Sequence, residues 1–286
     1  MNGYGNCAMA EITAPMVKKL REATNVGMME CKRALVEADG DMEKATKILR
    51  ERGVVIASKR ASRAANQGLI ASAMLEDGKT ASLIEVNCET DFVARNETFK
   101  AFVDQLARKA CETDGNLANE VKEEVTAKIA EIGENIVARR NARYVLQGPG
   151  MITSYIHLGN KLGVLVEVGC EKGETVKNDI FKELTKDITL HIAACSPQYL
   201  TPDEVPPEEI DSEREIYAKQ VKNKPAQVID KIVDGKLKKF FAEVCLLEQG
   251  FVKELKQKVS ALLDVKGKEL GDKLNIRRFV RYQLGE

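Results

Sequence analysis

The sequence of 286 residues has few of the residue types on which enzyme active sites are usually built. It contains no tryptophan and only two histidines, His157 and His191. It also contains no HExxH, GxSxG or GxxxxGK(S/T) motif, the patterns typical of zinc proteases, α/β-hydrolases and Walker-type nucleotide sites. We therefore expect a protein that makes no bond itself, holds no cofactor or metal ion, and binds no nucleotide directly.

Paired cysteines and long apolar runs are absent as well. None of the seven cysteines belongs to a CxxC pair, and the sequence has neither a signal-like start nor the roughly 20-residue apolar run that a membrane span requires. This pattern is typical of reduced thiols in a cytosolic protein. We expect a cytoplasmic localisation and no membrane partner.

No excess charge of either sign is present, because 44 lysines and arginines balance 44 aspartates and glutamates. The chain therefore has no bulk field that attracts nucleic acid. Nucleic-acid binding would rest on a basic stretch and on two arginine-rich segments, 139–143 and 277–281, with few aromatic residues among them for base stacking. The basic stretch contains Lys59, Arg60 and Arg63. We favour solvated or paired arginines on a sheet face over this alternative.

The N-terminal part of the chain divides into three stretches. Residues 1–8 show no periodicity and are predicted to be a flexible extension. Residues 9–57 carry the start and stop signals of three short helices, including a Gly40-Asp41 pair that ends one helix and caps the next. The small, basic stretch 58–67 is predicted to be a linker.

An internal repeat organises the rest of the chain. Residues 68–99 align with 150–181 without a gap, and eleven of the 32 positions are identical, where about two would match by chance. The identical pairs are Gly68/Gly150, Ile70/Ile152, Ser72/Ser154, Lys79/Lys161, Leu83/Leu165, Glu85/Glu167, Val86/Val168, Cys88/Cys170, Glu89/Glu171, Asn96/Asn178 and Phe99/Phe181. Each copy has two β-rich runs around a turn, followed by a helix. The turns lie at Asp77-Gly78 and Gly159-Asn160, and the helices begin near Asn96 and Asn178.

The repeat predicts an α+β fold with a duplicated core of antiparallel hairpins and helices. Copy one spans 68–149, and copy two spans 150–199 together with 249–286. Two weaker matches place the end of copy two at the C-terminus. They pair Val125-Thr126-Ala127 with Val259-Ser260-Ala261. They also pair Asn135-Ile136, Arg139-Arg140 and Arg143-Tyr144 with Asn275-Ile276, Arg277-Arg278 and Arg281-Tyr282, in condensed form.

Residues 200–248 interrupt copy two. This segment opens with three prolines and then becomes strongly helical, with a turn predicted at 223–225. We interpret it as an inserted helical hairpin. Its apolar positions either pack the two arms together or meet a second chain in a homodimer.

One loop breaks the repeat. Copy one has Thr90-Asp91-Phe92-Val93 where copy two has Lys172-Gly173-Glu174-Thr175. Because copy two is predicted to form the same scaffold without an aromatic residue there, the fold does not require Phe92, and the loop is a candidate binding site. The alternative is that Phe92 packs on its own helix.

Several segments carry a family resemblance. The string Glu85-Val86-Asn87-Cys88-Glu89-Thr90-Asp91-Phe92-Val93-Ala94-Arg95 resembles the signature of the elongation factor Ts family. The stretch MAEITAPMVKKLREATNVGMMECKRAL resembles the N-terminal module of that family, a three-helix, UBA-like (ubiquitin-associated-like) domain. Segments 132–136 and 155–166 resemble further family segments, and the likeness extends in order over residues 9–286.

The resemblance implies a guanine-nucleotide exchange factor for translation elongation that binds elongation factor Tu in its GDP-bound and nucleotide-free forms. The TDFV loop, Thr90 to Val93, would enter the GTPase domain near the magnesium and phosphate end of the nucleotide site. Phe92 would act as a wedge, and Asp91 would supply polar contacts. In this family the inserted hairpin can serve as a dimerisation module. Some relatives carry a further C-terminal helix that contacts Tu, and this contact is not assumed here.

The resemblance also implies contacts outside this loop. The matching positions are Arg21, Met28 and Met29 in the N-terminal module, and His157 with Gly159 and Asn160 at the second hairpin turn. Two alternatives stay open: Met29 belongs to the core of the small bundle, or His157 has only a structural role. We expect His191, on an apolar helix face, to be a core residue.

A different class of function fits the same N-terminal module. In this alternative the protein is a non-catalytic adaptor that binds partners through residues 12–57. The loop at 90–93 would then be unimportant for binding.

Overall fold

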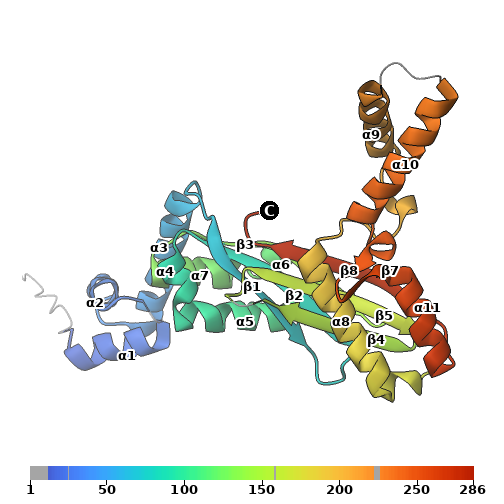
Figure 1. Cartoon of the computed structure of the whole chain (residues 1–286). Coiled ribbons are helices and arrows are strands. Elements are labelled where there is room, and N and C mark those ends of the chain that lie inside the picture. The colour runs from blue at the N-terminus through green and yellow to red at the C-terminus, as the bar shows by residue number, and fades with distance from the viewer. Residues whose placement is uncertain (1–11, 25, 158, 222–225) are drawn as a thin grey trace, which may run out of the picture.

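The computed structural model describes residues 12–24, 26–157, 159–221 and 226–286. The predicted extension at 1–8 and the predicted turn at 223–225 lie outside the described residues. Helices and antiparallel sheets both contribute to the fold, which confirms the α+β prediction (Figure 1).

Three helices form the N-terminal bundle: α1 (Ala14–Thr24), α2 (Met28–Glu37) and α3 (Met42–Arg60). As predicted, Asp41 caps α3, because its carboxylate accepts hydrogen bonds from two backbone N–H groups of the first turn at 2.9 and 3.0 Å. Each helix contributes a leucine to one small core. These are Leu20, Leu35 and Leu49.

Helix α3 is longer than predicted. It ends at Arg60, so residues 58–60 of the expected linker are helical. The reason is tertiary, because its second half packs against helix α7 (Lys122–Ile132), with Ile56 and Ala57 on the core of copy one. Most helical stability in proteins comes from such packing rather than from local signals.

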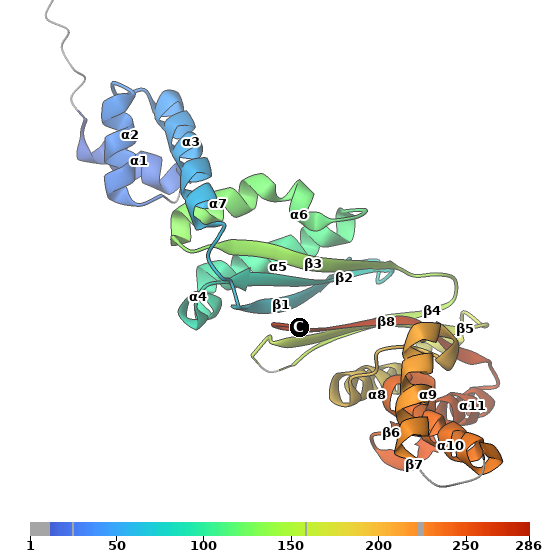
Figure 2. The same cartoon turned by 90° about the horizontal axis from the view of Figure 1, so that it is seen from above.

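Two three-stranded antiparallel sheets form the duplicated core. The first has the order β1-β2-β3, with β1 (Gln67–Met74), β2 (Thr80–Cys88) and β3 (Ile136–Val145). The second has the order β4-β5-β8, with β4 (Gly150–Ile156), β5 (Leu162–Cys170) and β8 (Leu274–Gln283). The sheets lie face to face, and helices cover the outer face of each (Figure 2).

The covering helices follow the repeat. In copy one they are α4 (Asp91–Arg95), α5 (Glu97–Glu112), α6 (Leu117–Glu120) and α7. In copy two they are the 3-10 turn η1 (Thr175–Lys177), α8 (Asp179–Cys195) and α11 (Val259–Leu270). The predicted starts are confirmed, because the side chains of Asn96 and Asn178 cap α5 and α8 with hydrogen bonds of 2.8 and 2.9 Å.

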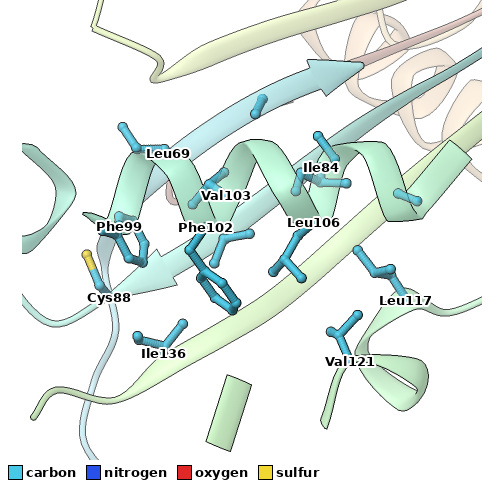
Figure 3. Close-up of a cluster of buried hydrophobic side chains, with 14 of the residues drawn as sticks. Leu69, Ile84, Cys88, Phe99, Phe102, Val103, Leu106, Leu117, Val121 and Ile136 are labelled. Carbon is cyan, nitrogen blue, oxygen red and sulfur yellow. The ribbon is translucent and has the colours of Figure 1, made fainter. Parts of the chain in front are cut away.

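Helix α5 supplies much of the core of copy one. Figure 3 shows Phe99 and Phe102 reaching from α5 into the same cluster as Cys88 of β2 and Ile136 of β3. Phe99 is fully buried, and its repeat counterpart Phe181 is fully buried in copy two. The repeated phenylalanine is therefore a core residue in both copies.

The strand pairing repeats between the copies. In the strand register Glu85 lies opposite Arg140 and Glu167 lies opposite Arg278. In both sheets the register shifts directly after the glutamate. The same bulge at the same position shows that the sequence repeat is also a structural one.

This register corrects one of the weaker sequence matches. Cys88 pairs with Ile136, whereas Cys170 pairs with Leu274. The counterpart of Ile136 is therefore Leu274, and the predicted match with Ile276 is wrong. The remainder of that match is confirmed, because Arg140 and Arg278 face the equivalent residues Glu85 and Glu167.

The second weak match is also wrong. Helices α7 and α11 end at equivalent left-handed glycines, Gly133 (φ 85°) and Gly271 (φ 60°). Counting back from these glycines places Val259 opposite Val121, one helical turn before the predicted partner Val125. A slip of one turn keeps the same helix face inward, so the apolar pattern alone does not reveal it.

A charged clasp joins the two sheets. Arg140 Nε donates to the fully buried carboxylate of Glu85 at 2.7 Å. The same guanidinium lies 4.3 Å from the ring centre of Tyr282 in the other sheet and donates to the Gln283 carbonyl at 2.8 Å.

The second sheet makes the reciprocal clasp. Arg278 Nε donates to the fully buried Glu167 at 2.8 Å, lies 4.1 Å from the ring centre of Tyr144, and donates to the Val145 carbonyl at 2.7 Å. Arg277 also pairs with Glu167, at 2.9 Å. The arginines of the two arginine-rich segments, 139–143 and 277–281, are thus engaged in contacts within the protein.

The inserted hairpin projects away from the sheets (Figure 1). Its elements are η2 (Pro202–Glu204), α9 (Pro207–Gln220), α10 (Ala226–Val244) and η3 (Leu246–Glu248), and the short strands β6 (Gly250–Phe251) and β7 (Glu254–Lys258) follow. Val233 and Leu237 of α10 are buried, whereas Ile216 and Val228 are exposed. The first packing alternative is therefore observed, because the two arms lie against each other. None of the described helices is apolar over enough of its length to span a membrane.

We predict that Glu167→Gln lowers the free energy of unfolding by about 1–3 kcal/mol at pH 7, because it leaves the partly buried guanidiniums of Arg277 and Arg278 without their counter-charge. Burial alone would raise the pKa of Glu167, but the Gln147 N–H and the guanidiniums of Arg277 and Arg278 outweigh burial and hold it below its usual 4.5. A lowered pKa contributes stability above pH 4.5 that is lost as the pH falls below it. Urea unfolding at pH 7 and at acid pH measures both effects.

The matched control is Glu174→Gln, because Glu174 is an exposed glutamate of the same copy. Its unfolding free energy should stay within about 0.5 kcal/mol of the wild type. Equal stability of Glu167→Gln and the wild type at pH 7 would contradict the role of the clasp.

Candidate functional site

The segment that breaks the repeat forms a helix cap and the first turn of helix α4, not an irregular loop. We call it the 90–93 turn. Thr90 Oγ1 accepts the Val93 N–H at 3.3 Å. The Thr90 N–H and hydroxyl donate to the two carboxylate oxygens of Glu134 at 3.0 and 2.7 Å. Thr90 is therefore occupied by contacts within the protein.

Phe92 points away from the protein. Its side chain is 80% exposed, more than any other large apolar side chain in the described ranges. The next residue, Val93, packs against the core of copy one, and Ala94 is buried. The alternative in which Phe92 packs on its own helix is wrong.

Asp91 lies at the start of the same turn. Its carboxylate pairs with Arg95 at 2.9 Å, one helical turn later; the Arg95 side chain is largely in solvent and that of Asp91 is partly exposed. An exposed pair of this kind contributes at most about 1 kcal/mol. The carboxylate can therefore exchange this partner for another at little cost.

Copy two holds the equivalent turn in the same way. Asp272 follows the helix-ending glycine of α11, as Glu134 follows that of α7, and it accepts hydrogen bonds from the N–H groups of Glu171 and Lys172 at 3.1 Å each. The position of Phe92 is taken by Glu174. The anchor is common to both copies, and the exposed ring is specific to copy one.

The base of the 90–93 turn is held from a second side. Glu89 accepts the Asn135 N–H at 2.6 Å and pairs with Arg63 at 3.4 Å, and these contacts hold the pKa of its carboxyl below the usual value. Cys88 donates from Sγ to the Thr90 carbonyl at 3.2 Å. Burial raises the pKa of the Cys88 thiol to about 12, so it is neutral and not a nucleophile.

The three predicted contact residues of the N-terminal bundle are all at its surface. Arg21 on α1 is exposed. Met28 and Met29 open α2 and are 50% and 64% exposed. The alternative that Met29 belongs to the bundle core is wrong, because Cys31 and Leu35 fill the inward positions of α2.

The turn between β4 and β5 has two different parts. His157 is exposed, and its Nδ1 lies 2.8 Å from the Tyr155 hydroxyl. Gly159 and Asn160 both have positive φ, 85° and 55°. Asn160 fastens the turn to the edge of β1, because its carbonyl accepts the Ile70 N–H at 2.7 Å and its side-chain amide donates to the Ile70 carbonyl at 3.3 Å.

His191 is a core residue, as predicted. It is fully buried, its Nε2 lies 2.9 Å from Gln249 Oε1, and its Nδ1 accepts the Val252 N–H at 3.1 Å. Burial lowers its pKa, so the ring is neutral.

The predicted site residues gather toward one end of the sheets. Helix α4 packs on β1, the turn with Asn160 is bonded to the same strand, and α3 leads into it. Figures 1 and 2 place these parts and the N-terminal bundle on the side away from the α9–α10 hairpin. The ranges that the structure describes contain no cluster of three or more His, Cys, Asp or Glu side chains that could hold a metal ion.

Sequence reasoning missed Glu134. The segment 132–136 drew attention only as a family segment, and the contact between Glu134 and Thr90 joins residues 44 positions apart. One signal was available, because an acidic residue follows the helix-ending glycine in both copies, as Gly133-Glu134 and Gly271-Asp272. Without the corrected register of α7 and α11 the two pairs do not align.

Comparisons with known proteins point to one family. A family model described as Elongation factor TS matches residues 89–286 of the chain. The chain is 46% identical over 287 residues to Elongation factor Ts of a Nitratiruptor species and 44% identical over 290 residues to that of Clostridium novyi, covering in each case 96% of this chain and 93% of the relative. It is also 44% identical over 277 residues to Elongation factor Ts of Nitratidesulfovibrio vulgaris, covering 96% of both chains.

We predict that Phe92→Ala leaves the free energy of unfolding within about 0.5 kcal/mol of the wild type, because the ring is already in solvent in the folded state. Phe99→Ala, a fully buried ring seven residues later, should cost about 3–5 kcal/mol. Urea unfolding of both variants measures the difference. A large loss for Phe92→Ala would contradict the exposed position of this ring.

Proposed function

The chain belongs to the elongation factor Ts family and is thus a translation elongation factor, and we propose that it speeds GDP release from elongation factor Tu by inserting Phe92 into that GTPase. The observation that carries the proposal is the 80% exposure of Phe92 on a turn whose other apolar residue, Val93, is packed inward. A ring held in water by an anchored turn is ready to be buried in a partner.

The energy available from this ring is of the size that nucleotide exchange needs. Burying a phenylalanine side chain in a partner contributes about 2–3 kcal/mol. If the ring is buried only in the nucleotide-free complex, this energy favours that complex by about 30- to 150-fold.

This preference speeds GDP release because the binding of the factor and the binding of GDP to the same GTPase are thermodynamically linked. GDP is retained by a GTPase because its phosphates and magnesium ion lie in a preorganised nest of backbone N–H groups and side chains. A factor that binds the nucleotide-free form more tightly weakens GDP binding by the same ratio. In this proposal the protein makes and breaks no bond, and holds no nucleotide, cofactor or metal ion of its own.

Asp91 suits the polar part of the mechanism. Its surface pair with Arg95 is weak enough to open when a partner approaches. The freed carboxylate and the adjoining backbone of the 90–93 turn then act on the magnesium and phosphate end of the nucleotide site.

Other exposed residues offer the partner a contact surface that is separate from Phe92. Met28 and Met29 form a flexible apolar patch at the start of α2, with Arg21 on the neighbouring helix. We assign His157 and Gly159 to the same group of partner contacts, and Asn160 holds their turn in place. The protein acts in the cytoplasm in this proposal, and the exposed faces of α9 and α10 are available for a homodimer.

We predict that Phe92→Ala lowers the rate at which catalytic amounts of the protein release GDP from elongation factor Tu by about 30-fold, because the differential burial is lost. The measurement is the fluorescence decay of a GDP analogue bound to Tu, in the presence of excess unlabelled GDP.

The matched control is Leu255→Ala, which removes another exposed apolar side chain, 76% exposed, on strand β7. It should release GDP at the wild-type rate. A folded Phe92→Ala protein that exchanges as fast as the wild type would refute the wedge.

We predict that the double variant Met28→Ser and Met29→Ser raises the Tu concentration needed for half-maximal exchange by about tenfold and leaves the maximal rate unchanged. The two methionines contribute binding energy in both nucleotide states of Tu, so their removal weakens both complexes by the same amount. A titration of the exchange rate against Tu·GDP separates the two quantities. If the double variant abolished binding while Phe92→Ala changed nothing, the adaptor alternative would replace the exchange proposal.

A further inference from the structure

The direction of Phe92 depends on a chain of contacts that begins at Glu134. The Glu134 carboxylate accepts from both the N–H and the hydroxyl of Thr90, at 3.0 and 2.7 Å. Thr90 Oγ1 in turn accepts the Val93 N–H and so caps α4. Phe92 lies between Thr90 and Val93, so this cap restrains its backbone.

Glu134 is itself held firmly. It follows Gly133, which ends α7 in the left-handed conformation (φ 85°) and donates its N–H to the Ile129 carbonyl at 2.8 Å. On the other side, the Asn135 N–H is bound by Glu89 at 2.6 Å. The carboxylate therefore transmits the position of a rigid helix end to the 90–93 turn.

We propose that Glu134 is the positioning residue of the exchange site, holding the 90–93 turn so that Phe92 is extended toward elongation factor Tu before the partner binds. This inference rests on the exchange function proposed above. A preorganised ring avoids the entropy of ordering the turn during binding, and it avoids collapse of Phe92 onto the surface of its own protein. Glu134 is partly buried beneath the turn and acts through Thr90.

The duplicated core supplies a matched control. Asp272 anchors the equivalent turn of copy two through the N–H groups of Glu171 and Lys172, but this turn presents no apolar side chain at the position of Phe92. A loss of general stability would be expected from removing either anchor. A loss of exchange is expected only from removing Glu134.

The experiment compares Glu134→Ala, Glu134→Gln and Asp272→Ala in the full chain. We expect Glu134→Ala to lower the maximal rate of GDP release about tenfold, because only a fraction of the molecules holds the ring in place, while the Tu concentration for half-maximal rate changes less than about twofold. Glu134→Gln should restore at least half of the wild-type rate, because an amide still accepts from the Thr90 N–H and donates to its hydroxyl. Asp272→Ala should exchange at the wild-type rate.

A second measurement reports on the turn without any partner. Because the sequence contains no tryptophan, Phe92→Trp introduces a single fluorophore at the tip. In this background we expect Glu134→Ala to lower the tryptophan anisotropy, and Glu134→Gln and Asp272→Ala to leave it unchanged.

The outcomes separate the inference from the proposed function. If the wild type does not speed GDP release, the proposed function fails, and a fall in anisotropy in the Glu134→Ala variant still supports Glu134 as the anchor of the turn. Unchanged anisotropy in that variant overturns the inference. A wild-type exchange rate for Glu134→Ala, or an equal loss of exchange in Glu134→Ala and Asp272→Ala, also overturns it.

Discussion

Two carboxylates withdrawn from water, those of Glu85 and Glu167, are the constraint on which the arrangement of this protein depends. A buried carboxylate is strongly unfavourable unless it is paired and hydrogen-bonded. Each is satisfied by arginines of a strand far away in the sequence, at a bulge that recurs in both sheets. Arg140 and Arg278 then reach across to the opposite sheet, so the same pairs that complete each sheet also hold the sheets face to face. The strand β1, which α4 and the turn with Asn160 contact, pairs with β2, the strand that carries Glu85.

Duplication has produced two anchored turns and one exposed ring. Glu134 and Asp272 hold equivalent backbone positions after equivalent helix ends, so the scaffold of the turn is independent of what its tip carries. Copy two carries charged and small residues at the tip, and copy one carries Phe92. The comparison within one chain separates what the fold requires from what a partner requires, which a single copy does not allow.

An exposed phenylalanine costs the folded state little, because the unfolded chain exposes it as well. The burial free energy of the Phe92 side chain is gained only when another surface covers it. Removing the ring should therefore change the exchange rate but not the free energy of unfolding. The neighbouring side chains have different roles: Val93 packs the turn against the core, Thr90 caps helix α4, and Asp91 makes only a weak surface ion pair. A rigid base with one free apolar side chain is the arrangement expected of a wedge.

The sequence by itself determined the α+β class, the duplicated core, the cap at Asp41, the helix starts near Asn96 and Asn178, and the candidate role of Phe92. These follow from local hydrogen bonds, from apolar periodicity and from comparison of one copy with the other, all of which are present in the linear sequence. Only the tertiary structure decided how far α3 extends, how α7 aligns with α11, and that Glu134 holds Thr90 while Asn160 holds Ile70. Those features depend on packing and hydrogen bonds between residues 44 to 90 positions apart, and local pattern carries no information about which distant partner a side chain will meet.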